Sequence, residues 1–422
     1  MVNRSRLLID LGPIRSSRDF RLVWLSQLAS TVGRQVVIVA VPFQAYVLTR
    51  SSFAVGLLGL FQAVPIVAAG LYGGALADRL DRRRLQLAGK AVVATGSAVL
   101  AVAASLPYTP LALVYAVVVF TSAASTIDQS ARMSTIPRLV SRELLPAAVS
   151  LGQVLFQAAA IVGPALAGLV IANLGLRWAY AIDVIAFFPA ASLIWRLSPQ
   201  PPLHDQHVVL GWRAPAQAIR YVARNRLVIG LFSSDLVAMV FGMPYAVFPA
   251  LALTEFRVGA GALGLFYAAP AVGALVGSVL SGWIGRVSRQ GMAVFVAIAL
   301  WGVAVAGFGL ADGRLWLGLP LLAVAGAADV VSAVFRNTIL QLSIPDSIRG
   351  RMSAFHMMVV TTGPRLGDLE AGAVAALVNP TFSVVSGGVA CVVGIGVLAG
   401  WLPEMRNRRR EDGLTANARA AE

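Results

Sequence analysis

The fold is decided at residues 73–84, which read GGALADRLDRRR. Apolar residues dominate on both sides of this stretch, over 54–77 and 85–106. Each apolar stretch has the roughly 20 residues that a helix needs to cross a bilayer. A short loop rich in arginine is typical of the cytoplasmic side of a membrane. The sequence therefore predicts two membrane helices joined by a short basic loop at the inner surface.

Ten more apolar stretches of this kind occur in the 422-residue chain. Hydrophobic residues make up 58% of the chain and charged residues only 13%, against roughly 25% in an ordinary soluble domain. Strands of a membrane barrel would be shorter and would alternate in polarity. The sequence predicts an all-α integral membrane protein with twelve membrane helices, at 22–48, 54–77, 85–106, 110–131, 147–173, 178–195, 227–253, 260–284, 291–311, 315–335, 352–378 and 381–402.

The distribution of basic residues predicts the orientation of these helices. With the N-terminus inside, 28 of the 34 Lys and Arg residues fall in inner segments. The outer loops hold only Arg50, Arg177, Arg257 and Arg314. This asymmetry places both termini in the cytoplasm. It also accounts for the net charge of +15 without nucleic acid, and it predicts contacts with anionic membrane lipids.

Two short motifs occur twice, at corresponding places in the two halves of the chain. GLFQAVP at 59–65 recurs as GLFYAAP at 264–270, and GPAL at 163–166 recurs as GPRL at 363–366. Both pairs fall in the same helix of each six-helix half. The sequence therefore predicts two six-helix pseudo-repeats. Such repeats are the architecture of transporters that rock about a site between the halves.

The loops and the tail divide the chain further. An amphipathic helix that lies at the membrane surface is expected from Gly211. His204 and His207 precede it and are interpreted as linker residues and not as a metal site. Cys391 is the single cysteine, so no internal disulfide can form. No cofactor is expected. The predicted segments are a cytoplasmic N-terminal segment (1–21), a six-helix half (22–196), a cytoplasmic linker (197–226), a second six-helix half (227–402) and a basic cytoplasmic tail (403–422).

Residues 73–84 resemble the signature loop of the major facilitator superfamily, G-x-L-A-D-R-x-G-R-R, with Asp81 where the family prefers glycine. The resemblance implies that Asp78 acts as a gate latch, which pairs with an arginine and caps a helix N-terminus of the other half. A basic membrane anchor with one carboxylate is the alternative. The gating residues that the resemblance implies are Gly74, Asp78, Arg79, Arg82 and Arg83.

A second motif, at 163–168, resembles the antiporter motif G-P-x-x-G-G of the same superfamily, with Ala167 in place of one glycine. Its residues Gly163, Pro164 and Gly168 would let helices of the two halves approach closely, although small-residue packing alone also explains them. Several stretches resemble a subgroup of bacterial efflux proteins, among them VAVP at 39–42, VGL at 55–57, PALA at 249–252 and GLFYAA at 264–269. This subgroup comprises the enterobactin exporters and their relatives, and the similarity covers nearly the whole chain, which implies a place in the plasma (inner) membrane of a bacterium. This resemblance implies export of a siderophore or a similar small molecule.

Arg34 lies near the middle of the first predicted helix. An arginine there costs roughly 2.5–3.5 kcal/mol on insertion scales and needs a partner or a wet cavity. We expect it to line a substrate cavity with Gln35 and Gln44. Contact with an anionic substrate and a structural ion pair remain open alternatives.

Four charged residues near the inner helix ends form two candidate ion pairs. Asp128 and Arg132 are four residues apart, and Asp329 and Arg336 are seven apart, so each pair shares one helix face. We expect these to be gating or structural pairs. Two other carboxylates, Asp183 and Asp235, are expected near a membrane surface, where water can reach them.

Span 352–378 carries Arg365, Asp368 and Glu370 near its middle. Asp368 can pair with Arg365, whereas Glu370 points to nearly the opposite face. A carboxyl group without a cation of its own is suited to proton exchange. Glu370 is therefore the leading candidate for proton coupling, with Asp368, held by Arg365, and Asp128 behind it. The alternative is that these carboxylates only hold helices together.

The sequence contains no G-x-x-x-x-G-K-[ST] loop for ATP and no H-E-x-x-H or G-x-S-x-G motif of a hydrolase. We therefore predict a secondary active transporter and not an enzyme. It would export a small siderophore-like or drug-like molecule by proton antiport, as a monomer. A broad-specificity multidrug pump is the alternative, and a non-transporting membrane sensor or scaffold is the hypothesis from a different class.

Overall fold

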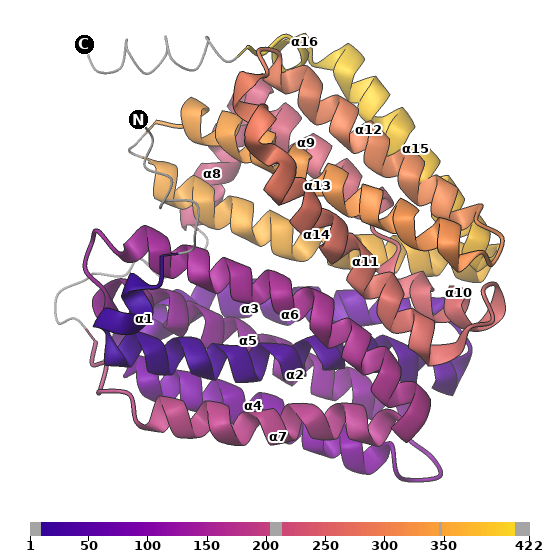
Figure 1. The fold of residues 1–422 in the computed structure, drawn as a ribbon. Coiled ribbons are helices and arrows are strands. Elements are labelled where there is room, and N and C mark those ends of the chain that lie inside the picture. Colours follow the sequence, from indigo (N-terminus) through magenta and orange to yellow (C-terminus); the bar gives the residue numbers. More distant parts are fainter. Residues whose placement is uncertain (1–9, 203–212, 346–347, 410–422) are drawn as a thin grey trace, which may run out of the picture. The chain divides into compact units, whose positions relative to one another are not determined.

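The computed structural model describes residues 10–202, 213–345 and 348–409. The side chains of residues 74, 75, 77, 78 and 213–216 lie outside the described set. Every regular element in the described part is a helix (Figure 1). The first half contains α1 (Gly12–Ser16), α2 (Arg18–Thr49), α3 (Ser52–Arg79), α4 (Arg82–Ala103), α5 (Leu111–Leu139), α6 (Leu145–Leu174) and α7 (Leu176–Trp195). The second contains α8 (Arg213–Arg224), α9 (Arg226–Phe241), η2 (Tyr245–Val247), α10 (Phe248–Thr254), α11 (Gly259–Val279), η3 (Leu280–Arg286), α12 (Gln290–Gly309), α13 (Leu315–Ser343), α14 (Arg349–Leu377), α15 (Pro380–Trp401) and α16 (Pro403–Arg406).

Eleven of the twelve predicted spans correspond to described helices that are long and apolar enough to cross a membrane. The twelfth, 352–378, forms the 29-residue helix α14 but does not meet the same criterion. Its charged residues, among them Arg365, Asp368 and Glu370, lower its hydropathy. The surface of the molecule is also that of a membrane protein, because many large apolar side chains are exposed along the helices. Exposed tryptophans stand at helix ends, where membrane proteins place them: Trp195, Trp316 and Trp401.

Two helices extend further than their apolar stretches predict. α5 continues to Leu139 and α13 to Ser343, so Arg132 and Arg336 lie inside helices and are buried, not in inner loops. Hydropathy marks the part of a helix that is in the bilayer, but the backbone stays helical until a residue stops it. In α13 that stop is Pro345, because a proline disfavours helical geometry at the residue before it.

The span predicted at 227–253 is not one continuous helix. α9 ends at Phe241, and η2 and α10 follow after Gly242 and Pro244. Pro244 has no amide hydrogen and cannot continue the helical ladder. The break frees the amide of Ala246, which donates to Asp368 Oδ1 at 3.1 Å. An irregular backbone inside a membrane protein requires this kind of internal partner.

The chain divides into two compact units. The first comprises Met1–Gln44 and Val64–Gly211, and the second comprises Ala45–Ala63 and Trp212–Glu422. In the second unit, the start of α3 crosses α14 where Gly56 meets Gly372. A Cβ atom on Gly372 would lie 2.6 Å from the carbonyl oxygen of Ser52. Small residues allow this close approach of helix backbones.

Helix α8 packs against α9 and α14 within the second unit. Its Ala218 is buried, and the Tyr221 hydroxyl donates to the carbonyl oxygen of Ser343 at 3.3 Å. Arg220 and Arg224 are exposed, so the helix is amphipathic. His204 and His207 lie outside the described residues.

Candidate functional site

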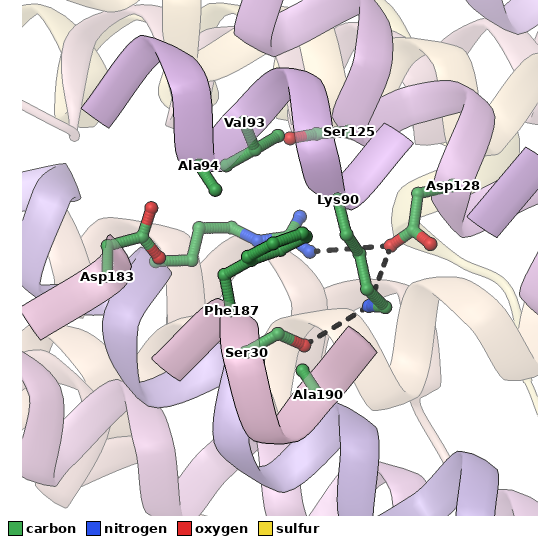
Figure 2. Close-up of a pocket in the computed structure, with 10 residues that line it drawn as sticks. Ser30, Lys90, Val93, Ala94, Ser125, Asp128, Asp183, Phe187 and Ala190 are labelled. Carbon is green, nitrogen blue, oxygen red and sulfur yellow. Dashed lines mark hydrogen bonds and ion pairs between the residues drawn. The ribbon is translucent and has the colours of Figure 1, made fainter. Parts of the chain in front are cut away.

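A polar pocket lies among α2, α4, α5 and α7 of the first unit (Figure 2). Its empty volume, which includes space open to solvent, is about 380 Å³. Four charged side chains from four different helices reach it. The lining residues are Ser30, Arg34, Lys90, Val93, Ala94, Ser125, Asp128, Asp183, Phe187 and Ala190.

Asp128 faces two cations across the pocket (Figure 2). Lys90 Nζ lies 3.3 Å from Asp128 Oδ2, and Arg34 Nη2 lies 4.0 Å from the same oxygen. Lys90 Nζ also donates to Ser30 Oγ at 3.3 Å. Lys90 and Asp128 are buried, whereas the Arg34 side chain is 32% exposed. A buried lysine requires a counter-ion, and Asp128 supplies it. Arg34 is the more accessible of the two cations because its side chain is partly exposed.

Asp183 is buried and not solvated near a membrane surface as predicted. Its Oδ2 accepts a hydrogen bond from Ser97 Oγ at 2.6 Å. Gly33 of α2 lies directly against its Oδ1. Asp183 is enclosed because α7 packs against both α4 and α2. It lies near the middle of α7.

Sequence reasoning missed Lys90, which lies inside the predicted span 85–106 and was not identified there as a site residue. In the structure it lies two turns inside α4, on a polar stripe with Gln86 and Ser97. Gln86 Nε2 donates to Thr135 Oγ1 at 3.3 Å, so each member of the stripe bonds to a neighbouring helix. The spacings of four and seven residues place the three side chains on one helix face, and this signal could have been found in the sequence.

Gln35 and Gln44 are not among the residues that line this pocket, and their predicted place in a substrate cavity stays a prediction. Both are buried in helix packing. Gln44 Oε1 accepts a hydrogen bond from the Tyr180 hydroxyl at 2.6 Å, and Gln35 packs against Gly163. The three predicted residues share α2 but point in different directions around it, so only Arg34 reaches the pocket.

Gly163 of the antiporter-like motif makes a close helix contact within the first unit. A Cβ atom on Gly163 of α6 would overlap Gln35 Cβ of α2. Gly363, at the corresponding place in α14, lies against Met239 of α9 in the second unit. Pro164 and Gly168 are buried. Gly163 therefore serves a helix contact inside the first unit, and the expectation that this motif lets helices of the two halves approach closely stays a prediction.

The predicted gating residues occupy the end of α3 and the start of α4. Gly74 and Asp78 are in the α3 helix, but their side chains lie outside the described set. Arg79 is exposed, Arg82 is buried, and Arg83 donates to the carbonyl oxygen of Trp195 while lying over its ring.

Asp81, the residue that departs from the family pattern, caps helix α4. Its Oδ1 accepts hydrogen bonds from the amides of Arg83 at 2.8 Å and Gln200 at 3.3 Å. An aspartate at this position satisfies a free helix amide, which glycine cannot do with a side chain. The bond to Gln200 also ties the start of the linker to α4.

A second charged cluster lies in the second unit. Arg336 Nη2 lies 2.8 Å from Asp235 Oδ1 and 3.8 Å from Asp329 Oδ1, and its Nη1 donates to Ser332 Oγ at 2.8 Å. Asp235 is 2% exposed, so the prediction that water reaches it is wrong. His356 Nε2 is 3.9 Å from Asp235 Oδ2, a neighbour that sequence reasoning did not identify.

The expected pairs are thus present only in part. Arg336 contacts Asp329 but lies closer to Asp235. In the described part of the first unit, Asp128 forms its ion pairs with Lys90 and Arg34, and none within 4.0 Å with Arg132. Helix spacing allows a pair but does not select it over partners on neighbouring helices.

In α14 the structure brings Arg365 and Asp368 together. Arg365 Nη1 lies 3.4 Å from Asp368 Oδ2, while Asp368 Oδ1 accepts from Ala246 N. Glu370 is half-buried, and no ion pair or hydrogen bond joins it to another described residue. Glu370 is thus a carboxyl group without a cationic partner in the part of the chain that the structure describes.

The fold is that of major facilitator transporters. A peptide transporter of the POT family, crystallised with a thioalcohol-conjugated peptide, superposes with a TM-score of 0.73 at 12% identity, over 92% of this chain and 96% of that one. A bacterial homologue of the iron transporter ferroportin, in an inward-facing state, gives 0.68 at 16% identity, over 93% and 99%.

Comparison of sequences assigns the chain to a narrower group of transporters than the fold does. It belongs to the transmembrane secretion effector family of the major facilitator superfamily, whose sequence model matches residues 10–418. It is 28% identical to the enterobactin exporter EntS of Citrobacter koseri, over 97% of this chain and 98% of that exporter. It is also 28% identical to EntS of Salmonella typhi, over 94% and 95%. The protein is therefore a multi-pass membrane transporter of exporter type and not an enzyme.

Proposed function

We propose that this protein is a secondary active transporter that exports a small anionic organic molecule, of siderophore type, across the bacterial plasma membrane by proton antiport. The observation that carries the proposal is the pocket of the first unit, where Arg34 and Lys90 share one ion-pairing carboxylate, Asp128. The second carboxylate of the pocket, Asp183, accepts a hydrogen bond from Ser97 instead. A partly exposed arginine beside an already paired lysine suits a catecholate or carboxylate group. The enterobactin exporters among the relatives support this substrate class.

The proposed topology has twelve membrane helices, with α14 as the twelfth and both termini in the cytoplasm. Its 29 residues are long enough to span a bilayer. Two of its charges pair with each other, which reduces the cost of placing them in lipid. The proposed segments are those given by the sequence: 1–21, 22–196, 197–226, 227–402 and 403–422.

The proposed transport cycle is rocker-switch alternating access of the two six-helix halves in a monomer. Asp78, in the loop that resembles the family signature, would latch one state. Glu370 is the leading proposed proton carrier, with Asp368 and Asp128 behind it, because it has no cationic partner among the described residues.

Transport by purified protein in liposomes tests the substrate class. Enterobactin, a catecholate iron chelator, and the cationic dye ethidium serve as probes. We expect counterflow of enterobactin, reduced at least tenfold in Arg34→Gln and restored in part by Arg34→Lys. Arg257→Gln, which changes an exposed arginine in a loop, is the matched control and should transport normally.

The other functions give different results. A multidrug pump would move ethidium as well as enterobactin, and Arg34→Gln would leave ethidium transport unchanged or increased. A non-transporting sensor or scaffold would move neither probe, in any gradient. Equal loss of both probes in Arg34→Gln, together with a lower thermal unfolding midpoint, would identify Arg34 as a structural residue.

A further inference from the structure

His356 stands beside a buried carboxylate in the second unit. Its Nε2 on α14 lies 3.9 Å from Asp235 Oδ2 on α9, and its ring packs edge-on against Phe232 with centroids 5.9 Å apart. Asp235 is almost fully buried, whereas the His356 side chain is 21% exposed. The histidine therefore connects an enclosed carboxylate with a more accessible position.

Both groups line a small pocket together with Arg336 and the apolar side chains of Leu231, Phe232 and Leu340. Its empty volume, which includes space open to solvent, is about 200 Å³. A proton from water can thus reach the His356 ring, while the apolar wall keeps the surroundings of Asp235 poor in water. Electrostatic interactions are strong in such surroundings.

The charges of this cluster do not balance when His356 is neutral. Two carboxylates, Asp235 and Asp329, then face one guanidinium, that of Arg336. One additional proton makes the numbers of positive and negative charges equal. A net charge in a low-dielectric site is costly, so the cluster favours the uptake of one proton.

Among the described residues, no other cation forms an ion pair within 4.0 Å with Asp235 or Asp329. Arg349 and Arg351 of α14 and Arg220 and Arg224 of α8 are exposed, and Arg226 of α9 pairs with Glu404. Asp235 is the carboxylate beside the His356 ring, and Arg336 lines the same pocket. Neither α15 nor η2 contains a charged residue.

We propose that Asp235 and His356 form a proton-binding site of this transporter. When the proton is bound, the imidazolium pairs with Asp235, and Arg336 can turn toward Asp329. When the proton leaves to water, Arg336 is the only cation left for Asp235. The proton thus selects between two arrangements of α9, α13 and α14. That the released proton drives export rests on the proposed function; that the site binds it does not.

The first test needs no substrate. The chain contains only three histidines, so protein labelled with 15N-histidine in detergent gives three sets of ring signals, and His356→Gln identifies that of His356. We expect the His356 signal to titrate between pH 5 and pH 8. We also expect Asp235→Asn to move the midpoint by at least one pH unit. Glu404→Gln, a carboxylate on the exposed surface, should not move it.

The site is overturned if the His356 signal stays at its neutral position from pH 5 to pH 8, or if Asp235→Asn leaves the midpoint unchanged. Asp235→Glu is the second variant if Asp235→Asn does not fold; it keeps the charge at a changed distance and should also move the midpoint.

The second test measures coupling, with enterobactin as the probe. In His356→Gln and Asp235→Asn, counterflow of enterobactin should stay within threefold of wild type. Accumulation of enterobactin driven by a pH gradient should fall at least tenfold. Accumulation at the wild-type level in both variants would remove this site from coupling. If the wild type ignores the pH gradient, the proposed antiport fails, while the titration still decides whether the site binds a proton.

Discussion

The ion pair of Lys90 and Asp128 is expected to contribute to the stability of the first unit. Their charges are buried and 3.3 Å apart, so neither can lose its partner without leaving an uncompensated charge. Breaking a buried pair costs about 3–5 kcal/mol, whereas removing both charges costs much less. Arg34 is exposed enough to be solvated when Asp128 is neutral.

We therefore expect Lys90→Gln and Asp128→Asn each to lower the thermal unfolding midpoint in detergent. The double variant should be closer to wild type than either single variant. Unfolding followed by tryptophan fluorescence measures this, with Arg142→Gln at an exposed position as the control. Additive losses in the double variant would show that the two charges do not interact.

Glu370 gives a prediction about coupling. Glu370→Gln keeps the shape of the side chain and removes its titration. If Glu370 carries a coupling proton, downhill exchange of enterobactin should survive, while accumulation driven by an acidic interior in inverted vesicles should be lost. A variant that still accumulates the probe against its gradient would show that Glu370 is not a carrier. Accumulation by the wild type that follows sodium instead of pH would contradict proton coupling altogether.

At the scale of elements, the contact between α2 and α6 depends on one glycine. Gly163 leaves no room for a Cβ atom beside Gln35, whereas Gly152 of the same helix has no atom within 4 Å of the position where its Cβ would lie. These two glycines make a matched pair, because helix propensity favours alanine at both positions.

Gly163→Ala is expected to lower stability by about 1–3 kcal/mol, the usual cost of overpacking. Gly152→Ala should leave stability unchanged or raise it by up to about 1 kcal/mol. Thermal unfolding in the same detergent measures both. Equal effects of the two substitutions would show that α2 and α6 are not held at this distance.

For the whole molecule, the orientation in the membrane is open to a direct test. Cys391 is the only cysteine and is fully buried, so the wild-type chain provides a background with little reaction toward a membrane-impermeant maleimide. Tyr108 and Arg142 lie in exposed loops at opposite ends of α5. The proposed topology puts the first loop outside and the second in the cytoplasm.

Tyr108→Cys should therefore react in intact spheroplasts, and Arg142→Cys only after the membrane is permeabilised. In inverted vesicles the order of reactivity should reverse. Labelling detected by a mass shift on a gel is sufficient, with the wild-type chain as the blank. Reaction of Arg142→Cys in intact spheroplasts would contradict the proposed orientation.

Much of the fold follows from local composition. Eleven of the predicted spans coincide with described helices that can cross a membrane, because a bilayer imposes a length and an apolar content that each segment must meet by itself. The family could also be recognised, since the signature loop and the motif at 163–168 are short and continuous in sequence. The extended ends of α5 and α13 and the break after α9 were missed, because they lie where hydropathy gives no signal.

The partners of the charged residues were decided only by the tertiary structure. Within a helix, spacing indicated Arg365 with Asp368 correctly, but it indicated Arg132 for Asp128, whose partner is Lys90. Lys90 and Asp128 are 38 residues apart and lie on different helices. Asp235 and His356, also on different helices, are likewise far apart in sequence. The sequence by itself determined which segments enter the membrane, because that depends on the chemistry of each segment; which charges neutralise one another depends on how the helices rotate and pack.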